Sequence, residues 1–269
     1  MATEPLQGKL DRLRQVISDM QSVLVAYSGG IDSTVLLKIA HEQLGARALG
    51  ITAVSPTFPE IELNGARQMA SEIGARHELV HTDQLKIPAF VQNDATRCFH
   101  CKTDLYQLME GLREPRQSKW IADGTNLDDL GDDRPGITAA REWGVRSPLV
   151  EAAFSKADVR ALARLLGLSN WNKPAAACLS SRVPRGTPIT IDKLRRVEQA
   201  EEILQAEGFR HVRVREHGEV ARIEVGPEEF SRLNQPDLRA RISDRLRQAG
   251  FRFVCVDLDG YRPGGTSLG

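Results

Sequence analysis

The first half of the chain alternates between two hydrophobic periods. Apolar residues at helical spacing predict an opening amphipathic helix: Leu6, Leu10, Leu13, Ile17 and Met20. Short apolar runs then predict strands, at 22–27, 47–54, 76–81 and 119–124, separated by helical stretches at about 33–43, 59–73 and 101–112. Helices between short buried strands are typical of βαβ units. The pattern predicts an α/β fold: an open, mostly parallel sheet with helices on both faces.

Two shorter helices are expected before the pattern changes. One lies near Ala139, and the other begins at Ser155, which forms a capping-box pattern with Asp158. Prolines and a glycine interrupt the alternation at 182–190. The interruption predicts a domain boundary, with domains at 1–185 and 186–269.

Beyond the boundary the pattern predicts a small α+β domain. A helix at about 192–205 precedes two alternating runs around His217 and Gly218, which predict a hairpin. A helix at 236–248 then leads to a strand at 251–258. Cys255 lies in that strand among apolar residues, so we expect it to be an ordinary core cysteine.

Composition narrows the range of partners. The chain has 36 basic and 36 acidic residues, so no net field attracts it to nucleic acid, and nucleic acid is an unlikely partner. It has no leader-like start and no long apolar run, so we expect a cytoplasmic protein with no membrane partner. In that compartment the four cysteines are expected to be reduced, metal-bound or reactive.

The stretch AYSGGIDSTVLL, residues 26–37, combines a strand, a glycine-rich turn and a helix start. Glycines let backbone amides approach an anion, and the helix dipole favours negative charge there. No Lys follows Gly29 and Gly30 where a Walker A loop requires it. The alternative to an anion site is a tight glycine turn that carries a capping serine.

SGGIDS resembles the PP-loop of the ATP pyrophosphatase superfamily, and the resemblance covers roughly the first 180 residues. It implies that ATP is cleaved between its α and β phosphates and that five residues cradle pyrophosphate: Ser28, Gly29, Gly30, Asp32 and Ser33. Ser55 and the DGTN segment, with Gly124 and Thr125, follow strands where an open parallel sheet binds its ligand. All eight are expected ATP-binding residues.

Such a site suits adenylation. An ionised carboxylate attacks the α-phosphate without a strong general base, while backbone amides and Mg²⁺ neutralise the pyrophosphate. Acidic residues after DGTN are candidate magnesium ligands or a lid, although a solvated charge run is equally compatible: Asp128, Asp129, Asp132 and Asp133, flanking Arg134. Asp129 is the first of these that we expect to matter for substrate.

Three cysteines suggest a thiol or metal centre. Cys98 and Cys101 form a C-x-x-C pair, and Cys178 precedes the domain boundary. A zinc site would want four ligands, and His100 between the pair is badly placed to be the fourth. A four-iron cluster on three cysteines would leave one iron open, as sulfide delivery requires.

The chain resembles the LarE family of ATP-dependent sulfur transferases, essentially from end to end. The segments that carry the resemblance include AYSGGIDSTVL, DGTNLDD, DDRPGITAAREWGVRSPL, KPAAACLSSRVPRG, VRVREHGEVARIEV and VDLDGYRPGGTS. It implies adenylation of a carboxylate of pyridinium-3,5-biscarboxylic acid mononucleotide and its conversion to a thiocarboxylate, in making the nickel-pincer cofactor of lactate racemase.

The resemblance implies one of two sulfur sources. In one type the cysteine matching Cys178 gives up its sulfur and becomes dehydroalanine; in the other, three cysteines hold a [4Fe-4S] cluster that carries an extra sulfide. This chain has Cys98 and Cys101, which the sacrificial type lacks. We therefore predict the cluster type, with Cys98, Cys101 and Cys178 as catalytic cysteines and cluster ligands.

Several polar residues are candidates to hold the substrate. One face of the hairpin carries Arg213 and Arg215. These arginines either bind the substrate phosphate or form a solvated outer face, and the resemblance favours phosphate binding. Ser181 and Arg182 would lie beside Cys178, where a loop salt bridge is the alternative. The resemblance also places Arg262 near substrate. Glu201 and Glu202 match a region where sacrificial members carry metal-ligating acids, but acids on a helix are more often solvated.

Two rival functions stay open. One is a PP-loop tRNA thiolase, which should bind RNA with strong salt dependence. The other is an ammonia-using PP-loop amidotransferase or ligase with purely structural cysteines. The favoured enzyme would use a small nucleotide substrate, sulfide or another sulfur donor, and we expect a homo-oligomer.

Overall fold

The computed structural model describes residues 5–131, 135–173 and 178–262. The chain divides into two compact units. The first unit comprises residues 1–84 and 96–176, and the second comprises 85–95 and 177–269. These bounds differ from the expected domains 1–185 and 186–269: the change falls at 176/177, and an eleven-residue stretch from the first half belongs to the second unit.

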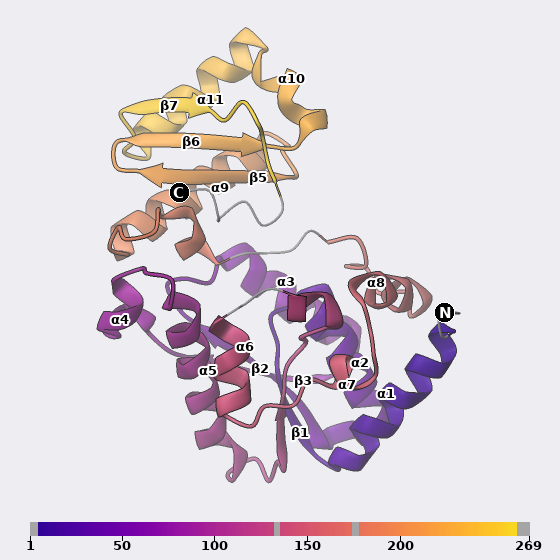
Figure 1. Cartoon of the computed structure of the whole chain (residues 1–269). Coiled ribbons are helices and arrows are strands. Elements are labelled where there is room, and N and C mark those ends of the chain that lie inside the picture. The colour runs from indigo at the N-terminus through magenta and orange to yellow at the C-terminus, as the bar shows by residue number, and fades with distance from the viewer. Residues whose placement is uncertain (1–4, 132–134, 174–177, 263–269) are drawn as a thin grey trace. The chain divides into compact units, whose positions relative to one another are not determined.

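The first unit is built on a four-stranded parallel sheet of order β3-β2-β1-β4 (Figure 1). Its strands are β1 (Val23–Ala26), β2 (Ala48–Val54), β3 (Arg76–His81) and β4 (Trp120–Ala122). The central strand β1 pairs with β2 on one side and β4 on the other. Because all four strands are parallel, the loops after them gather at one edge of the sheet.

Helices cover both faces of this sheet. They are α1 (Leu6–Met20), α2 (Ile31–Leu44), α3 (Glu60–Glu72), α5 (Arg97–Arg113), α6 (Pro135–Glu142), α7 (Pro148–Glu151) and α8 (Lys156–Leu165). On β1, Val23 and Val25 pack with α1 and α2, whereas Leu24 packs in a separate core with α5 and α6. This alternation along one buried strand confirms the predicted α/β layering.

Helices in the first unit begin close to where the sequence predicts, with one exception. Ser155 caps α8, and its side chain and that of Asp158 exchange hydrogen bonds with each other's backbone amides, so the capping box is confirmed. Helix α5 begins at Arg97, one turn before the expected start at 101, and therefore carries both Cys98 and Cys101. No helix in the described ranges is long and apolar enough to cross a membrane.

The second unit has a three-stranded sheet of order β5-β6-β7. Strands β5 (Val212–His217) and β6 (Val220–Val225) form the expected antiparallel hairpin, and β7 (Phe253–Val256) lies parallel to β6. The helices are α4 (Pro88–Val91), α9 (Ile191–Ala206), α10 (Phe230–Leu233) and α11 (Pro236–Gln248). Residues of α9 and α11 pack with one face of the hairpin to form the core.

Short 3-10 turns join these elements. They are η1 (Gly45–Arg47), η2 (Gln84–Lys86), η3 (Leu127–Gly131), η4 (Leu179–Arg182) and η5 (Pro227–Glu229). Asn93 explains why 85–95 belongs to the second unit. Its buried side-chain amide donates to the carbonyls of Val183, Pro184 and Thr187, at 3.3, 2.8 and 3.0 Å.

The expectation for Cys255 is wrong: its side chain is exposed. Among the described residues, strand β7 pairs only with β6, so it is an edge strand. Cys255 lies opposite Arg222 on the face of the sheet that α9 and α11 leave uncovered. The run of apolar residues suggested that both faces of this strand are buried. Phe253, in the same strand, is exposed as well.

Candidate active site

The turn between β1 and α2 can only be made with glycine at position 29. Gly29 has φ of +70°, and a Cβ there would lie 2.6 Å from the Cα of Ala66 on α3. Gly30 follows as the N-terminal cap residue of α2. The loop therefore passes against α3 with its backbone, as a backbone-lined anion site requires.

The two serines of the turn fix its shape. Their hydroxyl groups share a hydrogen bond of 3.2 Å, and Ser33 Oγ donates to the carbonyl of Gly30 at 3.1 Å. Ser33 Oγ also accepts from the amide of Ser28, and Ser28 Oγ accepts from the amide of Gly30. The loop is thus closed on itself at the start of α2, where the helix dipole favours an anion.

The DGTN segment lies directly against this loop. A Cβ on Gly124 would lie 2.8 Å from the backbone nitrogen of Ser33, so only glycine allows the approach. Buried Asp123 holds the segment by accepting from the hydroxyls of Tyr106, Thr125 and Ser147, at 3.0, 2.9 and 2.8 Å. Burial, together with the charge of Asp123, raises the pKa of Tyr106, so its phenol stays a donor. The fold brings the two predicted ATP-binding segments together.

Asp32 carries an ion pair that the sequence analysis missed. Its Oδ2 pairs with Lys156 Nζ, and its Oδ1 accepts from the side-chain amide of Asn126 at 3.1 Å. The backbone amide of Lys156 in turn donates to Asp128 at 2.8 Å. The only sequence signal for Lys156 was its place directly after the capping residue Ser155.

The other acids of the run after DGTN include one that bonds to nearby backbone. The carboxylate of Asp129, in the turn η3, accepts from the backbone amide of Asn126, the residue before this turn, at 3.1 Å. Asp132, Asp133 and Arg134 lie outside the described residues. Ser55 follows β2, as expected, and its hydroxyl bonds that of Thr57 at 2.9 Å.

Helix α5 presents the C-x-x-C pair on one face. Cys98 is exposed and Cys101 is half-buried, and neither forms a disulfide. Residues three apart on a helix are neighbours on its surface, so the two sulfurs can serve one ligand. The buried guanidinium of Arg97 donates to the sulfur of Cys98 at 3.9 Å. His100 instead lies edge-on to the ring of Phe99, with centroids 5.5 Å apart.

In the second unit, the backbone of Cys178 is held by two predicted substrate residues. Its carbonyl accepts from Ser181 Oγ at 2.8 Å and from Arg182 Nη1 at 2.9 Å. Arg182 is buried and makes a two-pronged pair with Glu201, at 2.8 and 2.9 Å. The arginine therefore links the candidate sulfur centre to helix α9.

The expectation that Glu201 is a solvated residue is wrong. It is 6% exposed, and it also accepts from the backbone amide of Val214 on β5 at 3.0 Å. Glu202 is exposed, as a solvated helix position should be. Helical spacing alone could not show that one of two adjacent acids points to a buried arginine on another segment.

The hairpin arginines are likewise buried or half-buried rather than solvated. Arg215 pairs with Glu224 across the strands at 2.9 and 3.0 Å and donates to the carbonyl of Ser181 at 2.8 Å. Arg213 lies over the ring of Tyr261, 5.1 Å from its centroid. Burial, reinforced by Arg182, lowers the pKa of Arg213, although a guanidinium stays charged near neutrality.

Together these side chains form an arginine cluster, which we define as Arg182, Arg213 and Arg215 with the carboxylates of Glu201 and Glu224. The cluster gathers three guanidinium groups, two of them fixed by carboxylates, Arg182 by Glu201 and Arg215 by Glu224, and guanidinium groups suit an anionic ligand. Arg262 differs, because it is exposed and pairs with Asp259.

The described residues show no group of three or more His, Cys, Asp or Glu side chains arranged to hold a metal ion. Cys98 and Cys101 belong to the first unit and Cys178 to the second. The three-cysteine cluster and the zinc alternative therefore both stay predictions.

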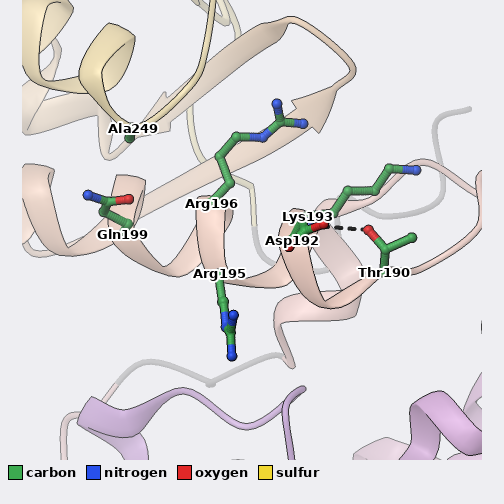
Figure 2. A pocket seen from close by; sticks show the side chains of 7 residues that line it. All are labelled: Thr190, Asp192, Lys193, Arg195, Arg196, Gln199 and Ala249. Carbon is green, nitrogen blue, oxygen red and sulfur yellow. Dashed lines mark hydrogen bonds between the residues drawn. The ribbon is translucent and has the colours of Figure 1, made fainter.

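Two surface hollows avoid all of the predicted residues. One, of about 470 Å³, surrounds the start of α9; Figure 2 shows Arg195 and Arg196 leaving the helix in opposite directions, so its cations do not converge. The other, of about 380 Å³, lies at the amino-terminal edge of the first unit's sheet and includes Ser22 and Arg47. That edge is opposite the loop at 28–33.

Known proteins resemble the chain in two ways. The asparagine synthase family model matches residues 13–93. The pyridinium-3,5-bisthiocarboxylic acid mononucleotide synthase of Lactiplantibacillus plantarum is 40% identical over 98% of this chain and 95% of its own length. The uncharacterized protein slr1717 of Synechocystis is 44% identical over 96% and 97%, and the uncharacterized protein MJ0830 of Methanocaldococcus jannaschii is 30% identical over 90% and 91%.

Proposed function

The chain belongs to the LarE family of ATP-dependent sulfur transferases, and we propose that it converts carboxylates of pyridinium-3,5-biscarboxylic acid mononucleotide to thiocarboxylates. The observation that carries this is the 40% identity with the synthase along nearly the full length of both chains. The glycine turn at 28–33, which lies against Gly124, supports the expected ATP chemistry. The product would serve nickel-pincer cofactor synthesis.

In the first step, a substrate carboxylate oxygen attacks the α-phosphorus of ATP and pyrophosphate leaves, giving an acyl-adenylate. The turn at 28–33 would hold the β and γ phosphates through its backbone amides, with Ser28 and Ser33 as hydroxyl donors. Mg²⁺ favours carboxylate oxygens. Asp32 lies in the first turn of α2, and Asp129 is connected to it through Asn126, so these carboxylates suit the ion. Bound there, Mg²⁺ would neutralise the leaving pyrophosphate.

In the second step, a sulfur nucleophile attacks the acyl carbon and AMP leaves, so that sulfur replaces the lost oxygen. We propose a [4Fe-4S] cluster held by Cys98, Cys101 and Cys178 as the source of that sulfur. The donor set fits, because two thiols lie one helical turn apart on α5 and none of the three cysteines is in a disulfide. Three thiolates leave one iron able to carry a sulfide.

We further propose that the arginine cluster, with Ser181, binds the phosphate of the mononucleotide. Its three guanidinium groups support this, and the carboxylates of Glu201 and Glu224 fix two of them in place. Arg262, which is exposed and pairs with Asp259, and Asp129, whose carboxylate accepts from the amide of Asn126, are further candidates for substrate contact.

The sulfur source is tested by cysteine variants. We expect the protein, purified without oxygen, to hold iron and acid-labile sulfide and to make several thiocarboxylates per molecule. Cys98→Ala and Cys101→Ala should each lose the iron, whereas Cys255→Ala, which changes an exposed cysteine on β7, should keep it. Iron-free protein that turns over repeatedly with only Cys178 would contradict the cluster.

Two further tests separate the rival functions. An ammonia-using ligase would keep full turnover when Cys98, Cys101 and Cys178 are all changed to alanine. A tRNA thiolase would bind RNA with an affinity that falls steeply between two salt concentrations.

A further inference from the structure

We propose that Asn170 is a positioning residue of the ATP site, which holds the peptide between Gly29 and Gly30 in the orientation that binds phosphate. The inference rests on the proposed function, because it assigns a further residue to the same site. Asn170 lies in the loop after α8, 141 residues beyond Gly29 in the chain. Its side chain is buried, and none of the motifs named above contains it.

Both donors of the Asn170 amide are directed at the start of α2. Its Nδ2 donates to the carbonyl of Gly29 at 3.1 Å and to Oγ1 of Thr34, in the first turn of the helix, at 3.1 Å. A side-chain amide has two N–H groups, so both are used. Among the described residues, the buried Oδ1 of Asn170 accepts no hydrogen bond, so the side chain is held through its donors alone.

The bond to Gly29 determines where the next amide points. The peptide is trans, and a trans peptide is planar, with its carbonyl and N–H groups pointing in opposite directions. Because Asn170 holds the carbonyl of Gly29, the amide of Gly30 points to the other side, where it donates to Ser28 Oγ at 3.3 Å. This hydrogen bond is long, so a phosphate oxygen can replace the hydroxyl as its acceptor.

A peptide between two glycines needs such a restraint. Glycine adopts many backbone conformations, so little resists rotation of the peptide between Gly29 and Gly30. Without Asn170, the buried carbonyl of Gly29 would lose its donor. Rotation of the peptide would relieve that cost, and it would also turn the amide of Gly30 away from the anion.

The loop that carries Asn170 shares a support with the turn. The amide and the hydroxyl of the preceding Ser169 donate to the carboxylate of Glu72 on α3, at 3.1 and 2.6 Å. The same helix carries Ala66, against which Gly29 packs. Helix α3 therefore fixes Asn170 and Gly29 relative to each other, as a positioning residue requires.

Binding of ATP and of AMP tests the proposal, because only ATP carries the phosphates that the turn would receive. We expect Asn170→Leu, which has a similar size and no donor, to weaken binding of ATP with Mg²⁺ about 10-fold, as for one lost hydrogen bond. Binding of AMP, measured by the same calorimetry, should not change. Ser169→Ala is the matched control, because it removes a bond of the same loop to α3 and none to the turn. It should keep both affinities.

A second variant keeps the test decisive if Asn170→Leu does not fold. Asn170→Ala also lacks the donor but adds no bulk, so the same selective loss of ATP binding is expected. Unchanged ATP binding in the folded variant, or equal losses for ATP and AMP, would overturn the proposal, because a general defect of the fold does not distinguish the two nucleotides. If the unmodified protein binds neither nucleotide, the proposed ATP site itself is wrong.

Discussion

The two units offer candidate anion sites of opposite kinds. In the first, the turn at 28–33 offers backbone amides, and its shape depends on glycines packed against Ala66 and Ser33. In the second, the arginine cluster offers side-chain charge, fixed by buried carboxylates. A backbone site is fixed by chain geometry, so substitution should damage function more than stability. A buried charge cluster is part of the core, so substitution should damage stability first.

The largest expected effect is on the arginine cluster. Glu201→Leu leaves Arg182 buried without its carboxylate, which should lower the free energy of unfolding by about 3–5 kcal/mol. Denaturant titration measures it, with Glu202→Leu, at the exposed neighbouring position, as the control that should change little. Equal losses in the two variants would show that the pair is not specifically stabilising.

The glycine turn should show the reverse behaviour. Gly29→Ala places a methyl group against the backbone of Ala66, so the loop must move, and ATP cleavage should fall by at least about 100-fold. Gly167→Ala is the matched control, because Gly167 has a similar φ of +68° but open space around its Cβ position. If both variants lose the same activity, left-handed strain rather than the contact with α3 is responsible.

A smaller effect concerns the support behind the turn. His77 bonds Thr52 at 2.8 Å, and Thr52 donates to the carbonyl of Tyr27, just before the turn. Burial, reinforced by Arg67, lowers the pKa of His77. The unfolded chain therefore binds the proton more readily, so the stability from neutral His77 is fully present above about pH 6.5 and is lost as the pH falls below it.

Melting temperatures measured between pH 7.5 and 5 check this. His77→Gln should flatten the decline on acidification, whereas His81→Gln, at an exposed position on the same strand, should keep it. An unchanged slope in His77→Gln would assign the acid sensitivity to other groups.

The same contrast explains what the sequence could predict. The turn at 28–33, the parallel sheet and the capping box at Ser155 depend on local spacing, and the structure confirms them. Gly124 was predicted at a strand end, and the parallel sheet places it on the turn because carboxyl ends of parallel strands meet.

Pairings between distant segments could not be predicted. Lys156 reaches Asp32 from another helix, and the burial of Glu201 depends on an arginine in a separate turn and an amide on β5. The prediction that Cys255 is buried was wrong for a related reason. An apolar sequence does not show whether a strand is central or at an edge, and β7 is at an edge. Side-chain partners and sheet order are set by tertiary packing, which residue periodicity does not encode.

The central claim is tested most directly by following ATP and the substrate together in one reaction. Phosphorus NMR and mass spectrometry of the protein with ATP, Mg²⁺, a sulfide source and pyridinium-3,5-biscarboxylic acid mononucleotide should show AMP and pyrophosphate in equal amounts, with oxygen exchanged for sulfur in the substrate. Release of ADP and phosphate, or AMP formation that leaves the carboxylates unchanged, would contradict it.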